Sequence, residues 1–367
     1  MLDYYDNLYS NFYENEEESY PDFFIEWDEA VRKGRSPGYY EPEELTDIIE
    51  IYLEENDSKR AKQAIEHALK MYATDEDLLY EILLLLNDYE QWNDLLALCE
   101  RYKKTADVWG DGHKLTALLH LGMEEEAFHF FGTLKVKYDD DDEALNIIYQ
   151  AMDEALIEMD LYESAIEVMK EAINVMGENI DFYWLLLQSF AALNEKEEVI
   201  KLADKIQKMD PLAAESWYRL GVAFQEIDDM EKAIDAFEYA HSLDSTSRNN
   251  IMSLVYAYEK NGNYNKALEK VKDFLHLYPD NYVVCIIASK ICAQVENWEE
   301  ALKYINDAIK LVPAMDSLYL YKSSFFLHLE EYKKAKSALK EGIEQTDDPE
   351  GDLTKELGRL NEKYPNF

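Results

Sequence analysis

The chain has 367 residues, more than one ordinary hydrophobic core organises, so either several domains or an elongated repeat is expected. Its 36 Lys and Arg residues stand against 78 Asp and Glu residues, a formal net charge of -42 that argues against nucleic acid as a partner. With only eight prolines and twelve glycines, the composition favours a nearly all-helical protein.

The first 41 residues form an acidic and aromatic N-terminal segment. Residues 1–31 hold ten acids, nine aromatic side chains and no Lys or Arg. A helix is predicted near residues 21–33, and its apolar stripe consists of Phe24, Trp27 and Val31. We expect this helix to cap the first of the repeated helix pairs that follow it in the chain. The alternative is that the segment is an acidic-aromatic ligand, which docks in a partner or in the protein's own groove.

The N-terminus has neither the basic nor the apolar region of a signal peptide, and no apolar run is long enough for a membrane span. The three cysteines, Cys99, Cys285 and Cys292, fall inside apolar helical patterns rather than in paired clips. They are interpreted as small buried residues of a reducing compartment. We therefore expect a cytoplasmic protein without membrane insertion.

From residue 42 onward, amphipathic helices follow one another in pairs. A first pair begins at Pro42 and a second at Glu76. A third, near Val108, is irregular: it starts 32 positions after the second and 38 before the next, and four glycines cluster between residues 108 and 145. The remaining pairs keep a constant step of 34 in the numbering and start near Asn146, Ile180, Ala214, Arg248, Tyr282 and Asp316.

Small residues recur on the same period. Ala233 is followed at steps of 34 by Ala267, Ala301 and Ala335. Around Ala233 the pattern is Trp217-x2-Leu220-Gly221-x2-Phe224, then Ala233-x3-Phe237-x2-Ala240. We expect Gly221 to lie against Ala233 and Ala240, where two helix backbones approach closely.

This pattern closely resembles the tetratricopeptide repeat. The resemblance implies an all-α, right-handed superhelical α-solenoid of antiparallel helix pairs, with about nine repeats in residues 42–349. Residues 350–367 are expected to form a C-terminal capping helix, because a solenoid end must be covered.

The sequence carries no recognisable catalytic signature: it has no glycine-rich phosphate loop, no H-E-x-x-H and no nucleophile elbow. Its seven histidines are dispersed, and the run Asp139 to Asp142 lacks the ligand pattern of a calcium loop, so it is interpreted as a helix N-cap. No catalytic, cofactor-binding or metal-binding residue is predicted, and an enzyme is the least favoured class.

The resemblance also implies a binding surface. In tetratricopeptide arrays the first helix of each repeat lines a concave face, and its fifth residue points into the groove. In this chain the fifth residues are Trp184, Tyr218, Met252, Ile286 and Leu320, and their neighbours along the groove are Gln188, Val222, Tyr256, Lys290 and Ser324. A ladder of large apolar residues suggests an apolar peptide or an amphipathic helix as ligand. The alternative is that these residues pack between adjacent repeats.

The family also contains modules that grip a partner's C-terminal carboxylate with cations on successive first helices. That pattern is missing here, because Trp184, Tyr218 and Met252 stand where cations would be required. We therefore expect a non-enzymatic scaffold that binds a protein or peptide segment, apolar in its centre and flanked by basic residues. The alternative is a structural repeat protein whose apolar surfaces serve self-association. The sequence does not identify the partner.

Overall fold

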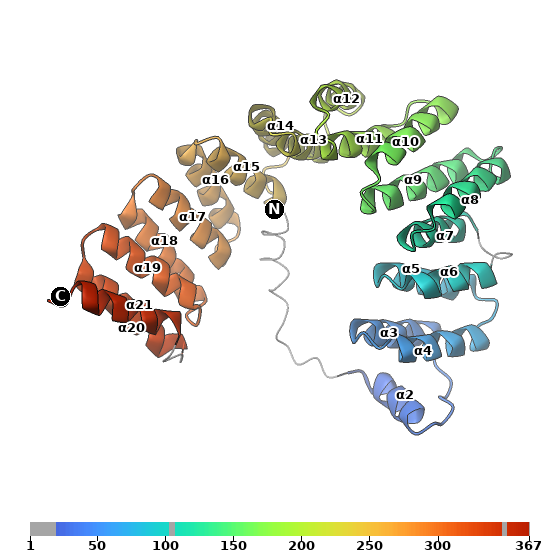
Figure 1. The fold of residues 1–367 in the computed structure, drawn as a ribbon, viewed down its shortest axis with the longest axis horizontal. Coiled ribbons are helices and arrows are strands. Elements are labelled where there is room, and N and C mark those ends of the chain that lie inside the picture. The colour runs from blue at the N-terminus through green and yellow to red at the C-terminus, as the bar shows by residue number, and fades with distance from the viewer. Residues whose placement is uncertain (1–19, 103–106, 347–350, 367) are drawn as a thin grey trace. The chain divides into compact units, whose positions relative to one another are not determined.

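A computed structural model of the chain describes residues 20–102, 107–346 and 351–366 (Figure 1). These residues form twenty α-helices and no strand, so the predicted all-α class is confirmed. The first ten helices are α2 (Asp22–Arg32), α3 (Pro42–Glu54), α4 (Ser58–Met71), α5 (Glu76–Asp88), α6 (Trp92–Arg101), α7 (Val108–His120), α8 (Glu124–Lys137), α9 (Asp142–Glu158), α10 (Tyr162–Met176) and α11 (Ile180–Ala192). The other ten are α12 (Lys196–Met209), α13 (Ala214–Glu226), α14 (Met230–Leu243), α15 (Arg248–Lys260), α16 (Tyr264–Leu277), α17 (Tyr282–Gln294), α18 (Trp298–Leu311), α19 (Asp316–His328), α20 (Tyr332–Thr346) and α21 (Asp352–Lys363).

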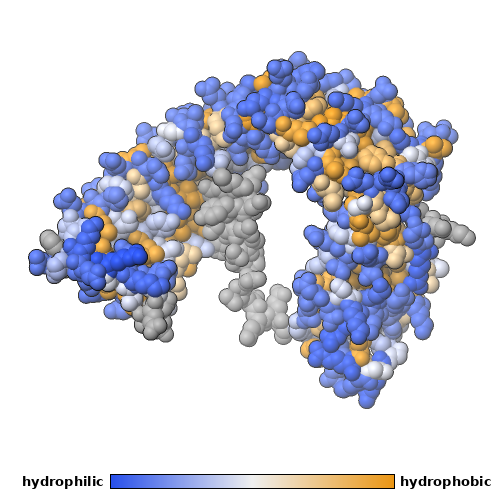
Figure 2. Space-filling view, in the orientation of Figure 1, coloured by the Kyte–Doolittle hydropathy of each residue, from blue (hydrophilic) through white to orange (hydrophobic). Residues whose placement is uncertain are grey.

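The chain divides between Leu193 and Asn194 into two compact units, here called the N-terminal and the C-terminal unit. Within each, a first helix packs against the second helix that follows it, as α3 does with α4 and α13 with α14. The terminal helices also pack: α2 contacts α3, and α21 contacts both α19 and α20. The apolar side of each terminal helix is buried, through Phe24 and Trp27 on α2 and through Leu353 and Leu360 on α21. Figure 2 shows hydrophilic side chains over most of the visible outer surface.

The turn between first and second helix has the same geometry in each repeat. One residue of every such turn adopts a positive φ: Asn56, Glu90, Gly122, Asp160, Asn194, Asp228, Gly262, Glu296 and Glu330. In most of these turns the next N–H reaches back to a carbonyl of the first helix, as Asn263 N donates to Tyr258 O at 2.8 Å. This is the Schellman arrangement, which satisfies carbonyl groups left open at a helix end.

The small residues of the repeat are buried where predicted, since Ala233, Ala267, Ala301 and Ala335 are all inaccessible to solvent. The expected neighbour of Gly221 needs correction. A Cβ atom at this position would lie 2.4 Å from ring atoms of Phe237, so it is the phenyl ring on α14 that requires a glycine on α13.

One first helix departs from the expected start. Helix α9 begins at Asp142, four residues before Asn146, and has 17 residues where α13 has 13. The Asp141 carboxylate accepts the N–H of Ala144 at 3.0 Å, and Ala144 and Leu145 are buried, so the cap and the burial favour an extra turn. The longer step of 38 residues before the fourth repeat is thus accommodated by a longer helix α9.

Helix α9 also carries an unusual buried group. Asp153 occupies the position that Gly221 holds two repeats later, and it is 0 % exposed. Within the described part of the chain, neither carboxylate oxygen has a hydrogen-bond partner. Burial, with a smaller contribution from the charge of Glu154, raises the pKa of Asp153 to about 8. The carboxyl group is therefore held largely protonated at neutral pH.

Candidate partner-binding site

The structure divides the predicted groove residues between the two units. Trp184 and Gln188 lie on α11 in the N-terminal unit, and the indole of Trp184 is only 6 % exposed. Tyr218, Met252, Ile286 and Leu320 lie on α13, α15, α17 and α19 of the C-terminal unit, and all four are half-buried. Trp184 thus differs from its successors, because it has little surface left for a partner.

Tyr218 packs on the core of its own repeat. The ring of Tyr218 lies 5.8 Å from that of Phe237, the residue packed against Gly221. A side chain that is half-buried keeps one side in contact with the protein and offers the other to solvent. Four such residues at a step of 34 form what we call the apolar ladder: Tyr218, Met252, Ile286 and Leu320.

The neighbouring positions add aromatic and cationic groups. Val222, Tyr256 and Lys290 are half-buried, whereas Ser324 is exposed. The Lys290 Nζ lies 5.3 Å from the ring centroid of Tyr321, and the Lys260 Nζ lies 5.4 Å from that of Tyr256. These cation–π contacts hold the lysine stems along the apolar surface while the ammonium groups reach water.

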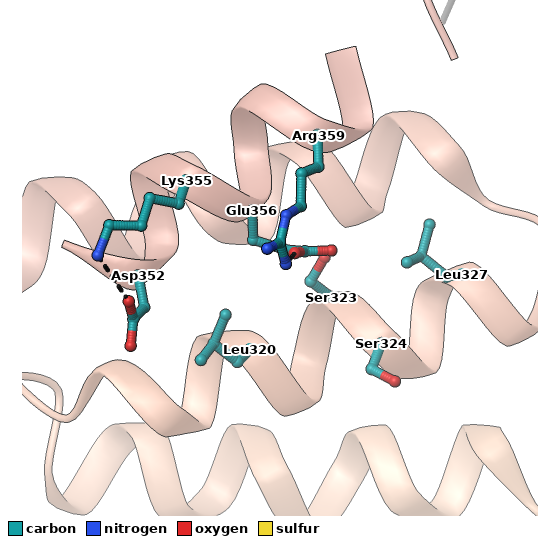
Figure 3. Close-up of a pocket in the computed structure, with 8 residues that line it drawn as sticks. All are labelled: Leu320, Ser323, Ser324, Leu327, Asp352, Lys355, Glu356 and Arg359. Carbon is teal, nitrogen blue, oxygen red and sulfur yellow. Dashed lines mark hydrogen bonds and ion pairs between the residues drawn. The ribbon is translucent and has the colours of Figure 1, made fainter. Parts of the chain in front are cut away.

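A hollow of about 470 Å³ adjoins the C-terminal end of the ladder (Figure 3). Leu320, Ser324 and Leu327 line it from α19, and charged side chains of α21 line the other side. There the Lys355 Nζ pairs with Asp352 at 3.0 Å, and a guanidinium nitrogen of Arg359 pairs with Glu356 at 3.2 Å. The volume is that of a small-ligand or side-chain pocket. Sequence reasoning did not foresee the hollow, which arises from how α21 packs on α19.

The two cysteines of α17 take no part in this surface. Cys285 and Cys292 are buried and free, as is Cys99. Burial raises the pKa of Cys285 to about 11 and that of Cys292 to about 12, so both thiols stay protonated at neutral pH. Among residues 20–102, 107–346 and 351–366, no cluster of three or more His, Cys, Asp or Glu side chains is placed to hold a metal ion. None of the described helices is long and apolar enough to cross a membrane.

Comparison with known proteins places the repeats in a family. Residues 185–247 match the family model described as tetratricopeptide repeat, and residues 226–308 match the one described as anaphase-promoting complex, cyclosome, subunit 3. The chain is 22% identical over 268 residues to the TPR repeat-containing protein YpiA of Bacillus subtilis. That alignment covers 72% of this chain and 62% of YpiA, so the chain spans less than two thirds of the relative's length.

A solved structure agrees on the fold. The C-terminal part of a TPR repeat-containing protein from Cytophaga hutchinsonii superimposes with a TM-score of 0.52 at 17% identity, covering 67% of this chain and 98% of that one. The fold and the family are generally those of non-catalytic interaction scaffolds. The resemblance carried by the alanine spacing is therefore confirmed: residues 185–308 match tetratricopeptide-type repeats, and the fold is that of tetratricopeptide-repeat proteins.

Proposed function

We propose that the protein is a non-enzymatic cytoplasmic scaffold whose C-terminal unit binds a peptide or helical segment of a partner along the apolar ladder. The observation that supports this most is the repetition of a large, half-buried apolar side chain at the fifth position of four consecutive first helices. Large apolar groups kept partly in water at a fixed step fit a ligand with apolar residues at a matching step.

The negative charge of the chain favours a partner with basic residues. A formal charge of -42 attracts a ligand whose apolar centre is flanked by basic residues, and it raises the rate of encounter at low salt. The apolar ladder would then anchor the centre of the segment. Since such anchors contribute most of the affinity, salt should change the association rate more than it changes the residues required for binding.

The test is a double truncation, Tyr218→Ala with Met252→Ala, in the full chain. Peptides selected by display on the wild-type protein should lose affinity by about 30-fold, which corresponds to roughly 2 kcal/mol for anchor residues. Because both side chains are only half-buried, unfolding should become easier by less than the roughly 2 to 5 kcal/mol of a core truncation.

A matched control removes exposed side chains from second helices, with Tyr239→Ala and Leu277→Ala, which should leave affinity unchanged. A large loss of stability in the Tyr218 and Met252 variant would show that the ladder is packing between repeats. Intact stability with unchanged affinity would place the binding site elsewhere.

Self-association is the second candidate, supported by the same ladder, because a second copy could cover it. Light scattering over a range of concentrations separates the two functions. A dimer that grows with concentration and is abolished by the double truncation would favour self-association over binding of a different protein.

A further inference from the structure

A second surface, independent of the apolar ladder, lies within the N-terminal unit. Helix α7 lies between α5 and α9 and contacts both (Figure 1). The three helices enclose a hollow of about 260 Å³, lined chiefly by α7 and α9. It falls outside the residues that the sequence singled out, and its lining differs in chemistry from that of the ladder.

The floor of the hollow is formed by small residues. A Cβ atom added to Gly112 of α7 would lie 3.3 Å from the Cβ of Ala151 on α9, which shows how closely the two backbones approach. Ala155, one turn beyond Ala151, continues the floor along α9. Because these side chains are short, they leave space between the longer side chains that also line the hollow.

One of these longer side chains is aromatic. Trp109, at the start of α7, lines the hollow and is 48 % exposed. Its ring centroid lies 6.4 Å from that of Tyr80, in an edge-on arrangement. A half-exposed tryptophan beside a hollow is unusual, because this side chain buries more apolar area than any other when it is covered. An exposed indole is also the best of the aromatic surfaces for a cation.

Acidic side chains also line the hollow. Glu154 and Glu158 both line the hollow from α9. Glu158 is paired with His120, at 2.8 Å from its Nε2, whereas Glu154 forms no ion pair within the described part of the chain. Although Glu154 reaches solvent, the surrounding protein and the charge of Glu158 raise its pKa, so a cation placed beside it would relieve an unfavourable charge.

The hollow also contains an unused hydrogen-bonding group. The Nε2 atom of His113, which lines it from α7, is shielded from solvent and has no partner among the described residues. Burial lowers the pKa of His113, so its imidazole is neutral near pH 7 and does not compete with a bound cation. None of the residues that line the hollow is a Lys or an Arg.

We propose that this hollow binds an arginine side chain of a partner protein, with the guanidinium stacked on Trp109 and paired with Glu154. A planar guanidinium suits both of these lining groups, since it stacks on an indole and donates two parallel hydrogen bonds to one carboxylate. The short floor of Gly112 and Ala151 leaves room for the arginine stem. The site thereby supplies a specific place for one of the basic residues that the charge of the chain attracts.

The test uses the full chain with its six tryptophans replaced by 5-fluorotryptophan, and the Trp109 resonance is assigned with Trp109→Phe. The probe is the pentapeptide acetyl-Ala-Leu-Arg-Leu-Ala-amide, compared with the same peptide carrying citrulline, the neutral isostere of arginine. The arginine peptide should shift the Trp109 fluorine resonance in a saturable way, and the citrulline peptide should bind at least about fivefold more weakly, because it lacks the charge-assisted pair.

Glu154→Gln should weaken the arginine peptide by a similar factor of about five to ten. The matched control, Glu167→Gln, removes the same charge from an exposed position on α10 and should leave the affinity unchanged. Equal weakening by the two variants, equal binding of the citrulline peptide, or the lack of a saturable shift at Trp109 would each overturn the proposal.

The result of the Trp109 titration can be distinguished from the result of the test of the apolar ladder. The double truncation of Tyr218 and Met252 lies in the other unit and should leave the Trp109 titration unchanged. A shift confined to Trp217, next to the ladder on α13, would mean that the peptide binds the C-terminal unit instead, and it would contradict an arginine site in the N-terminal one.

Discussion

The two units repeat with different regularity. In the C-terminal unit the left-handed turn residues Asn194, Asp228, Gly262, Glu296 and Glu330 recur at a constant step of 34 in the numbering. In the N-terminal unit the steps from Asn56 to Glu90, Gly122 and Asp160 are uneven, at 34, then 32, then 38. The turn geometry is nevertheless the same in both, so the differences in spacing are taken up by helix length, as in the 17 residues of α9.

The turn geometry is therefore the constant part of the repeat, and the helix length is the variable part. A Schellman turn fixes several hydrogen bonds at once, whereas a helix gains or loses one turn at little cost where burial allows it. Buried polar atoms without a hydrogen-bond partner occur in both units among the described residues, and in the N-terminal unit they include both carboxylate oxygens of Asp153.

The largest effect is expected at Asp153, the buried acid of the irregular unit. Asp153→Val, which places there the residue found at the equivalent Val255, should stabilise the protein by about 2 to 4 kcal/mol at pH 7. The folded pKa of about 8 lies above the ordinary 3.8, so the folded state retains a proton that the unfolded chain has lost. Burial of Asp153 therefore costs the folded state no ionisation penalty below about pH 4, and the free energy of unfolding falls as the pH rises through 8.

Urea unfolding at several pH values, followed by circular dichroism, measures this effect. The wild-type protein should lose stability between pH 5 and 8, and the valine variant should show a flatter profile. Asp235→Val on α14 is the control, because Asp235 is exposed and its replacement should change stability by less than about 0.5 kcal/mol. An unaltered pH profile in the Asp153 variant would contradict the burial of an unpaired acid.

A pair of glycines compares the regular and the irregular unit directly. Gly221→Ala should destabilise the protein by about 1 to 3 kcal/mol, because the new methyl group meets the Phe237 ring. Gly132→Ala on α8 should instead stabilise it by up to about 1 kcal/mol, since among the described residues nothing outside the local helix backbone and the two chain neighbours lies within 4 Å of the added Cβ, and alanine is the better helix former. Thermal unfolding of both variants tests this pair. Melting temperatures that shift in the same direction, relative to the wild-type protein, would contradict the packing described.

Hydrogen exchange measures whether the irregular repeat opens more readily. Helices α8 and α14 have 14 residues each, but α8 buries three of them and α14 buries five. Local opening should therefore be easier in α8, and its amides should exchange about tenfold faster, equivalent to roughly 1.4 kcal/mol. Equal protection of the two helices would mean that the irregular spacing does not weaken the array.

The smallest effect concerns the turns that the units share. Glu296 adopts the left-handed conformation that Gly262 occupies one repeat earlier. Glu296→Gly should stabilise the turn by about 1 kcal/mol, because a Cβ atom disfavours this conformation, and Gly262→Glu should have the opposite effect. Chemical denaturation of the two variants tests the pair, and a destabilising Glu296→Gly would show that side-chain contacts dominate at this turn.

The sequence by itself determined the helix pairs, their family and most of their starts. Amphipathic periodicity and a small residue at a fixed step are local signals, and local hydrogen bonding acts on them directly. The start of α9 was predicted four residues late, since the extra turn depends on the burial of Ala144 and Leu145. The neighbour of Gly221 was likewise assigned to the alanines rather than to Phe237, because a step of 34 does not say which ring a glycine meets.

Only the tertiary structure decided which groups share a surface. It buried Trp184 while leaving the other four fifth-position residues half-buried, although all five have the same place in the repeat. It also brought Trp109 and Glu154, 45 positions apart in the chain, into the lining of one hollow. Exposure and proximity depend on what packs against a residue from neighbouring helices, and no local pattern specifies that packing.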